Sequence, residues 1–594
     1  MGKNKLVLLK SSLLPNNRGK FIKFLLGGGL LDEIFYTHRR VYFQLFEMLN
    51  WFRKRLHKKL CIYIFCLLLP FILLPLALSP QKETKCSYVL ILVAAYWFLE
   101  PVSIAVPALM PVFLYPLLGI VSSTDICLNY MKETVMLLLG GFIMAAAVEE
   151  CKLHERIALK ILLTIGTEIK WLMLGFMIST MFVSMWISIT ATCALMSPIA
   201  EAVLKRINTP IKRNKLLSRE LTKKGSDTSL TESVIDDHEN VDFKHLESHT
   251  IRVTLFLGIC YAANLGGTGT IIGTATNMVF KGMLEELYPE CEEITFQTWM
   301  FYNIPGMIIC VLMGWIYLWM IYIRCLKHKP SKEDLHEIIS RKYAELGAVT
   351  YHEAEVVILF SVLILLWLFR ESNLLTGWIH LIGSDKTIGD AVPAIAISFL
   401  AFILPSDIRD LNSRPILEWK KIQPKLPWNV LLIVGGGFAL GDGAQKSGLS
   451  KLIGEYLGRM RMFPPSVVVA IMVFIASLVT EIMTNVVTAT VLLPSFSQMA
   501  VGMGVNPLLV MLPITVACSY AFMLPVGGPG NAISFENGHM KTQDMVRPGI
   551  VMNIACCCVQ IIMLNTLGVV LFDPYTLPPW ANMTNMLSNS SLSS

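Results

Sequence analysis

Apolar stretches of about 18 residues or more recur along this chain, from near residue 60 to residue 572. An α-helix needs a stretch of this kind to cross a bilayer. Hydrophobic residues make up 54% of the 594 residues and charged residues only 16%, against about 25% charged in soluble proteins. A closed β-barrel would show short alternating segments, which are absent from the sequence. The sequence therefore predicts an all-α polytopic membrane protein.

The residues before the first apolar stretch are strongly basic. Residues 1–59 contain thirteen Lys and Arg residues and three acidic ones. Such an excess beside a membrane segment marks the cytoplasmic side, so we expect a cytoplasmic basic N-terminal region. Because topology places these positive charges, the net charge of +7 does not indicate a nucleic-acid partner.

Two N-glycosylation sequons follow the last apolar stretch. They begin at Asn582 and Asn589, within the tail 573–594. Acceptor asparagines of this kind belong to extracellular surfaces, so we expect an extracellular, glycosylated tail. With the N-terminus inside and the C-terminus outside, the number of full crossings must be odd.

Two apolar stretches, 171–205 and 462–501, are each too long for one span. Each has a hydroxyl-rich break in its middle, and the first reads SMWISITATCALMSP. Two half-length helices that meet at a polar tip form a re-entrant hairpin, which membranes tolerate where the tip is buried in protein or lines a water-filled cavity. Counting both stretches as hairpins leaves about eleven crossings, in agreement with the odd number.

The two halves of the chain align, without a gap over more than fifty positions, when Ser184 is placed on Thr480. Matches at glycine, proline and hydroxyl positions are harder to obtain by chance than matches between apolar residues. Counting spans puts the two hairpins on opposite sides of the membrane, so the repeats have inverted topology, as in secondary transporters with a midplane site. The other matches include Gly140-Gly141-Phe142 with Gly436-Gly437-Phe438, Ser188 with Thr484, Thr192 with Thr488, and Pro198 with Pro494.

These features divide the chain into regions. We expect the basic region at 1–59, a first repeat at 60–205, a cytoplasmic loop at 206–250, the end of the first repeat at 251–323, a cytoplasmic loop at 324–352, the second repeat at 353–572 and the tail at 573–594.

A helix with a second break follows each hairpin. The breaks read AANLGGTGTIIGTATN at 262–277 and MLPVGGPGNAIS within the broken helix 506–536. Glycine and proline at membrane depth free backbone carbonyls and let the backbone approach a ligand closely. Helix N-termini at the hairpin tips favour an anion, and free carbonyls and hydroxyls are hard oxygen ligands for sodium. Two breaks at corresponding places favour a binding site for both.

The chain resembles the divalent anion:sodium symporters, a family of sodium-coupled dicarboxylate, citrate and sulfate transporters. The resemblance runs from about position 60 to position 582 and leaves out the basic N-terminal region. It lies in motifs that include SMWISITATCALMSPIAEAVL, CYAANLGGTGTIIGTATN, TEIMTNVVTATVLLP and YAFMLPVGGPGNAI. The resemblance implies a plasma-membrane homodimer, with a scaffold domain and a transport domain that moves like an elevator in each protomer. It implies sodium as the coupling ion and no cofactor.

The resemblance also assigns site residues. It implies a first sodium site at Ser184, Ser188 and the backbone of Gly266 and Gly267, and a second at Thr480, Asn485 and the break that contains Pro525 and Gly527. It implies substrate contacts from Ser188, Thr190, Thr268, Thr484, Asn485 and Asn531.

The sequence departs from the family pattern at several of these places. Ile189 stands where the family has the first hairpin's asparagine, and an isoleucine offers neither an amide donor nor a side-chain oxygen. Thr484 replaces a serine and keeps a hydroxyl, while Gly528 stands where the family usually has a threonine. Glu100-Pro101 lies where an acidic residue is usually followed by a small apolar one.

Several functions therefore stay open. We expect sodium-coupled uptake of di- and tricarboxylates of the succinate and citrate class. The alternatives are a sulfate-type symporter, a sodium-independent exchanger, and an anion-binding paralogue that does not transport. The sequence does not choose among the anions. An enzyme is not expected, because the eleven histidines are scattered without a His-Glu-x-x-His motif and the glycine clusters fit no nucleotide-binding loop.

Overall fold

The computed structural model describes residues 60, 62–166, 168–222, 231–324, 332–370, 377–379, 388–407, 409–410, 413–457 and 463–581. Within these ranges the secondary structure is helical, apart from one isolated β-bridge between Pro405 and Pro415. The predicted all-α class is thus confirmed for this part of the chain. Among the described residues, those up to Ile72 belong to one unit and those from Leu73 onward to another, and the helices described below belong to the second unit.

Five helices among the described residues are long and apolar enough to cross a membrane. They are Ser123–Glu150, Phe296–Ile323, Tyr351–Leu368, Asn485–Met503 and Thr542–Phe572. Shorter apolar helices, of 10 to 17 residues, include Ile169–Ser184, Pro465–Val479 and Leu508–Ala517. These three short helices end at the predicted hairpin tips or breaks, which explains their length. The chain is therefore a helical membrane protein.

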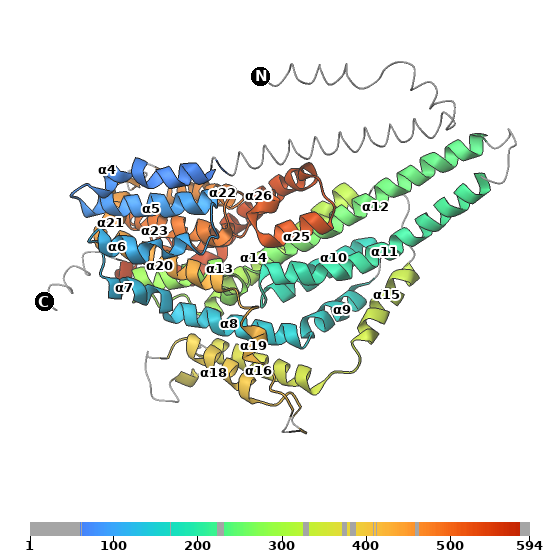
Figure 1. Ribbon diagram of the computed structural model, residues 1–594, viewed down its shortest axis with the longest axis horizontal. Helices are drawn as coiled ribbons and strands as arrows, with labels where there is room; N and C mark the ends of the chain where they lie inside the picture. The colour runs from blue at the N-terminus through green and yellow to red at the C-terminus, as the bar shows by residue number, and fades with distance from the viewer. Residues whose placement is uncertain are drawn as a thin grey trace, which may run out of the picture. The chain divides into compact units, whose positions relative to one another are not determined.

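Seven consecutive helices of the first repeat run from residue 133 to residue 318 (Figure 1). They are α8 (Glu133–Glu150), α9 (Leu153–Ile165), α10 (Ile169–Ser184), α11 (Ile189–Thr222), α12 (Thr231–Gly266), α13 (Ala275–Leu287) and α14 (Phe296–Leu318).

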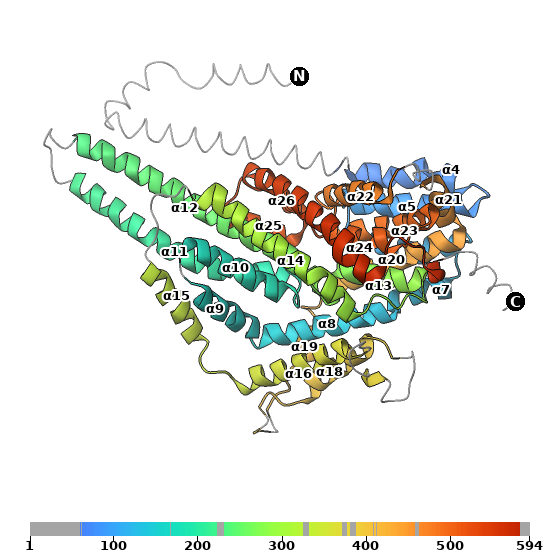
Figure 2. The same cartoon turned by 180° about the vertical axis from the view of Figure 1, so that it is seen from behind.

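The second repeat has the same order of helices (Figure 2). They are α20 (Trp428–Ser447), α21 (Leu449–Leu457), α22 (Pro465–Val479), α23 (Asn485–Met503), α24 (Leu508–Ala517), α25 (Pro529–Asn537) and α26 (Thr542–Met563). The remaining longer helices are α5 (Lys82–Leu99), α6 (Met110–Leu117), α7 (Ser123–Leu128), α15 (Lys332–Glu345), α16 (Tyr351–Leu368) and α18 (Ala391–Ile403).

The helix boundaries follow the alignment between the two halves. The second helix of each hairpin begins at the same aligned position, α11 at Ile189 and α23 at Asn485. Each later break contains a 3-10 turn, Ile271–Gly273 in the first repeat and Pro525–Gly527 in the second. Both long apolar stretches are thus two helices with a break between them, as the hydroxyl-rich sequences predicted.

Much of the polar connection 206–250 is helical. The structure is helical from residue 206 to Thr222, where α11 ends, and again from Thr231, where α12 begins. Figures 1 and 2 show the extended helices α11 and α12 side by side. The sequence between 206 and 250 has one proline and one glycine and many Lys, Arg, Leu and Glu residues, which favour helix. Residues 324–352 likewise contain α15.

Buried charges anchor α13 to its neighbours. Lys281 pairs with Asp390, which precedes α18, and both side chains are buried. Arg370 Nε lies 3.1 Å from Asp390 Oδ1, and Thr134 Oγ1 donates to Glu285 at 2.9 Å. Breaking a buried ion pair leaves an uncompensated charge and costs about 3–5 kcal/mol. These contacts therefore hold the second half of the first broken helix against α8 and the start of α18.

Candidate functional site

The first hairpin tip is tied to the first break by a buried hydroxyl. Ser184 Oγ, fully buried at the end of α10, donates to the Ala263 carbonyl at 2.6 Å. Thr270 Oγ1 donates to the Met185 carbonyl at 2.5 Å. A methyl group added to Gly266 would lie 2.4 Å from the Met181 carbonyl oxygen, so only glycine permits this approach of α12 to α10.

The second hairpin repeats this contact. Thr480 Oγ1 is fully buried and donates to the Cys518 carbonyl at 2.6 Å. Thr480 aligns with Ser184 in the repeat. The carbonyls that accept from these two hydroxyls also lie in similar places, since Cys518 follows the last residue of α24 and Ala263 lies near the end of α12. The same bond at corresponding positions shows that the sequence repeat is also a structural repeat.

Two asparagines, one in each repeat, brace the breaks in the same way. Asn277 Nδ2 donates to the carbonyls of Gly267 at 3.0 Å and Thr270 at 2.8 Å. Asn531 Nδ2 donates to the carbonyls of Ala521 at 2.7 Å and Leu524 at 3.3 Å. Each amide thus replaces the helical hydrogen bonds that its break has lost.

The oxygen atom of Asn531 is also bonded. Asn531 Oδ1 accepts hydrogen bonds from Asn264 Nδ2 at 2.8 Å and from Cys260 Sγ at 3.2 Å. Asn531 is only 1% exposed, so its amide is fully engaged with protein atoms. The structure therefore places this predicted substrate residue as a brace of the second break, beside the site.

Three oxygen atoms converge on the Asn485 amide at the second hairpin. The Asn485 amide nitrogen donates to Thr480 Oγ1 at 3.0 Å and to the carbonyl oxygens of Cys518 and Gly527 at 3.2 Å. These three oxygens, from a hydroxyl and from unwound backbone, are hard ligands of the kind that binds sodium in broken-helix transporters.

The first hairpin lacks the matching amide. Ile189 occupies the position of Asn485, and its aliphatic side chain faces Gly267: a methyl added to Gly267 would lie 3.2 Å from Ile189 Cγ1 and 3.3 Å from Cδ1. The predicted first sodium residues Ser184, Gly266 and Gly267 are therefore together, but an isoleucine stands where the second hairpin has an amide.

The second break lies between the two hairpin tips. Gly527, at one end of this break, faces Asn485 of the second tip. Gly530, at the other end, faces Ile189 of the first tip, since a methyl added to Gly530 would lie 3.0 Å from Ile189 Cγ2. The structure thus gathers the predicted residues of both tips around one segment.

The other predicted residues differ in their exposure and hydrogen bonding. Thr268 is 2% exposed and its hydroxyl donates to the Leu265 carbonyl at 2.7 Å. Ser188 is exposed and its hydroxyl accepts from the Ala191 N–H at 3.3 Å. Thr190 and Pro525 are half-buried. Among the described residues, Thr484 Oγ1 is a buried atom with no hydrogen-bond partner.

A buried carboxylate holds the second tip in place. Glu481 is 2% exposed and accepts hydrogen bonds from the backbone N–H groups of Phe522, Met523 and Leu524 at 2.7 to 3.0 Å. Asn553 Nδ2 donates to the same carboxylate at 2.8 Å. These bonds support a structural role for Glu481, linking the tip to the second break and to α26.

Sequence reasoning missed the residues that brace the breaks. Asn264, Asn277 and Cys260 were not predicted, although Asn277 and Asn531 each lie near the end of a quoted break motif. Aligning the two breaks with each other, at a shift of their own, would have paired these two asparagines. The predicted glycosylation residues Asn582 and Asn589 lie outside the described residues.

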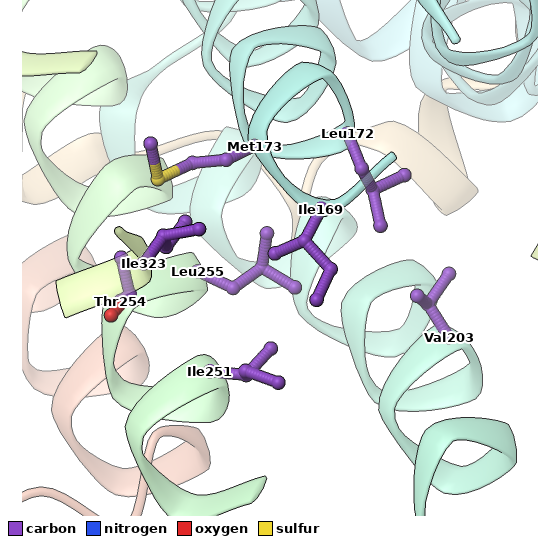
Figure 3. Close-up of a pocket in the computed structure, with 8 residues that line it drawn as sticks. All are labelled: Ile169, Leu172, Met173, Val203, Ile251, Thr254, Leu255 and Ile323. Carbon is purple, nitrogen blue, oxygen red and sulfur yellow. The ribbon is translucent and has the colours of Figure 1, made fainter. Parts of the chain in front are cut away.

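Two cavities lie near the first hairpin. One of about 570 Å³ runs along α11 and α25, beyond the contact of Ile189 with Gly530. Such a volume suits a small-molecule ligand. The other, of about 10 Å³, is shown in Figure 3 and has room for no more than about one water. The larger cavity is lined by Ala194, Ser197, Pro198, Glu201, Ala202, Lys205, Lys342, Ile533 and Asn537.

Paired hairpins that each meet a broken helix are the architecture of helical secondary transporters. A family model described as "Sodium:sulfate symporter transmembrane region" matches residues 54–573. The chain therefore belongs to this symporter family, and the prediction that it is not an enzyme is confirmed by that membership.

The relatives span nearly the whole chain. The Na(+)/citrate cotransporter of Rattus norvegicus is 38% identical over 550 residues, which cover 87% of this chain and 96% of the relative. The Na(+)/dicarboxylate cotransporter 3 of Mus musculus is 36% identical over 560 residues, which cover 87% and 93%. Solute carrier family 13 member 2 of Mus musculus is 38% identical over 556 residues, which cover 87% and 94%.

A solved structure shows a weaker likeness. Neisseria gonorrhoeae MtrF, described in connection with a class of antimetabolite efflux pumps, aligns with a TM-score of 0.49 and 12% identity, covering 83% of this chain and 96% of that chain. At this level the likeness supports no inference about function.

Proposed function

We propose that this protein is a secondary active transporter that couples sodium to the uptake of di- and tricarboxylates across the plasma membrane. The observation that carries the proposal is the convergence of Thr480 Oγ1 and the carbonyl oxygens of Cys518 and Gly527 around the Asn485 amide. Thr484 directly precedes Asn485, and its buried hydroxyl has no hydrogen-bond partner in the described structure. This hydroxyl is therefore free to donate to a bound anion. The relatives named for citrate and dicarboxylates point to the same substrates.

The finer architecture is part of this proposal. Eleven crossings and two re-entrant hairpins place the two tips at the midplane from opposite sides. The N-terminus is cytoplasmic, and the tail 573–594 is extracellular and carries glycans at Asn582 and Asn589. The regions of the chain have the boundaries that the sequence predicts. Each protomer of a homodimer has a scaffold domain and a transport domain that moves as an elevator. The recurring bonds at Ser184 and Thr480 support the repeat on which this architecture rests.

Sodium binding uses the second cluster in this proposal. Thr480 Oγ1 and the carbonyls of Cys518 and Gly527, next to the Asn485 amide, hold one ion, and Ser184 with the backbone at Gly266 and Gly267 forms the first, weaker site. The break at Pro525 to Gly527 supplies unwound backbone. Ser188, Thr190, Thr268 and Thr484 contact the anion together with Asn485, while Asn531 holds the second break.

Ile189 favours a second candidate function, a protein that binds anions without coupling their movement to sodium. A lost hydrogen bond to a charged group weakens affinity by about ten- to a hundredfold. Sodium-independent exchange or binding without transport would then follow.

Uptake of labelled succinate, citrate and sulfate into cells that express the chain separates these functions. Saturable uptake of a carboxylate in sodium that disappears in choline supports the proposal. Uptake of sulfate alone supports the sulfate-type alternative, and carboxylate uptake unchanged by choline supports the exchanger. Absence of uptake, with the protein shown at the cell surface, supports the non-transporting paralogue.

A further inference from the structure

The cavity of about 570 Å³ is set apart from the hairpin tips. It lies beside α11, which packs against both α15 and α25, and its lining on α11 begins at Ala194 and ends at Lys205. Because a helix rises about 1.5 Å per residue, Lys205 lies about 24 Å along α11 from Ile189 at the tip. A small molecule held at the Lys205 end of the cavity is therefore out of reach of the tip.

The uncharged polar side chains of the cavity already have partners in their own helices. Ser197 Oγ donates to the Cys193 carbonyl at 2.7 Å, and Asn537 Nδ2 donates to the Ile533 carbonyl at 3.0 Å. The other uncharged lining residues are alanine, proline and isoleucine. Recognition of a ligand in this cavity therefore depends on its charged side chains.

These charged side chains make the wall of the cavity positive. The lining has two lysines, Lys205 and Lys342, and one carboxylate, Glu201. Glu201 forms an ion pair with Arg252, whose Nη1 also donates to the Asn537 carbonyl at 2.8 Å. This pair neutralises the carboxylate and leaves the charge of the two lysines in excess. Lys205 is exposed and Lys342 is half-buried, so an anion from solvent can approach both.

We propose that this cavity is a second binding site for di- and tricarboxylates, in which Lys205 and Lys342 each hold a carboxylate group. A cleft lined by one sign of charge concentrates small ions of the opposite sign. Because ammonium groups hold the anion, binding in this cavity needs no sodium. Two cations also favour an anion with two or three carboxylates over one with a single carboxylate.

This inference rests on the proposed function, to which it adds a binding site on the path of the released anion. Lys205 directly precedes the connection 206–250, which the proposed topology places in the cytoplasm. An anion that leaves the hairpin tips towards the cytoplasm passes along α11 and meets the lysines there.

The test measures binding of labelled citrate to the purified full chain by equilibrium dialysis, in choline without sodium and at low ionic strength. The wild-type protein should bind citrate under these conditions, and acetate should compete at least tenfold less well than unlabelled citrate. Binding should weaken as salt is added, because salt screens accessible charges. Absence of citrate binding in choline would overturn the inference.

Removing the two lysine charges supplies the contrast. An accessible ion pair strengthens binding by up to about fivefold, so the double variant Lys205→Gln/Lys342→Gln should bind citrate in choline about tenfold more weakly than wild type. Lys421→Gln is the matched control, since its side chain is 45% exposed, pairs with Glu418 and lies outside the cavity lining. This control should bind citrate as wild type does.

A variant with the opposite expected sign guards against a loss of binding through misfolding. Glu201→Gln removes the carboxylate from the cavity wall and leaves the charge of Arg252 uncompensated. It should bind citrate in choline several-fold more tightly than wild type. A protein that is merely destabilised would not gain affinity.

The outcomes separate the inference from the function beneath it. Citrate binding in choline that is the same in wild type, the double lysine variant and Glu201→Gln overturns the cavity site, and intact sodium-dependent uptake then leaves the proposed function standing. Citrate binding that responds to these variants as expected, in a protein that shows no uptake, supports the cavity site and overturns the proposed transport.

Discussion

Ile189 and Asn485 each begin the second helix of a hairpin, at the same aligned position of the two repeats, and they meet opposite ends of one broken segment. Ile189 faces Gly530, and Asn485 faces Gly527. The two repeats therefore share their backbone arrangement and differ in chemistry, with an amide and its oxygen partners at one tip and an aliphatic side chain at the other.

Gly530→Ala should disrupt the packing of the first tip, because the added methyl would lie 3.0 Å from Ile189 Cγ2 and 3.2 Å from Cys193 Sγ. Overpacking of this kind costs about 1–3 kcal/mol. We expect a lower melting temperature and reduced uptake. The double variant Ile189→Ala/Gly530→Ala should recover much of both, and strictly additive losses in the double variant would contradict the contact.

Thr480→Val should weaken sodium binding, since it removes the hydroxyl that joins Cys518 and Asn485. We expect the sodium concentration for half-maximal uptake to rise about tenfold or more. Thr480→Ser keeps the hydroxyl and should stay near wild type. Ser184→Ala, the equivalent change in the first repeat, should have a smaller effect because no amide completes that cluster. Equal effects of the two substitutions would show that both sites bind sodium alike.

Glu481→Gln should destabilise the second tip. The carboxylate accepts bonds from three backbone N–H groups and Asn553, and an amide nitrogen in its place would face donors. Unmatched buried groups cost about 1–3 kcal/mol each, so the melting temperature of the purified variant should fall. The exposed Glu536→Gln is the control. A variant as stable as this control would argue against a structural role for Glu481.

Glu293 should make stability depend on pH. It lies between α13 and α14, where burial raises the pKa of its carboxyl above the ordinary value, and Trp580 Nε1 donates to its Oε1 at 3.2 Å. A raised folded-state pKa means that the ionised carboxyl of Glu293 is less stable in the folded protein than in the unfolded chain, so it lowers the free energy of unfolding at high pH. This penalty disappears as the pH falls through the folded pKa towards the unfolded one. Glu293→Gln keeps the acceptor for Trp580 and removes the charge.

We therefore expect Glu293→Gln to melt at a higher temperature than wild type at pH 8 and to lose this advantage as the pH approaches 5. Melting curves of the two proteins across that range check the prediction. A constant difference between them at every pH would contradict it.

The sequence predicted the backbone of the site better than its side-chain contacts. The helix starts at Ile189 and Asn485 and the breaks near Gly267 and Gly527 follow from glycine, proline and hydroxyl patterns, which act locally. The pairing of Asn264 with Asn531 and of Lys281 with Asp390 joins residues far apart in the chain. Such contacts depend on tertiary packing, which no local pattern specifies.

The most direct test of coupling uses the purified full chain in sealed liposomes with labelled succinate at equal concentration on both sides. An imposed inward sodium gradient should drive succinate above its external concentration, and an ionophore that collapses the gradient should release the excess. Succinate that only equilibrates across the membrane, with or without the gradient, would contradict sodium-coupled transport.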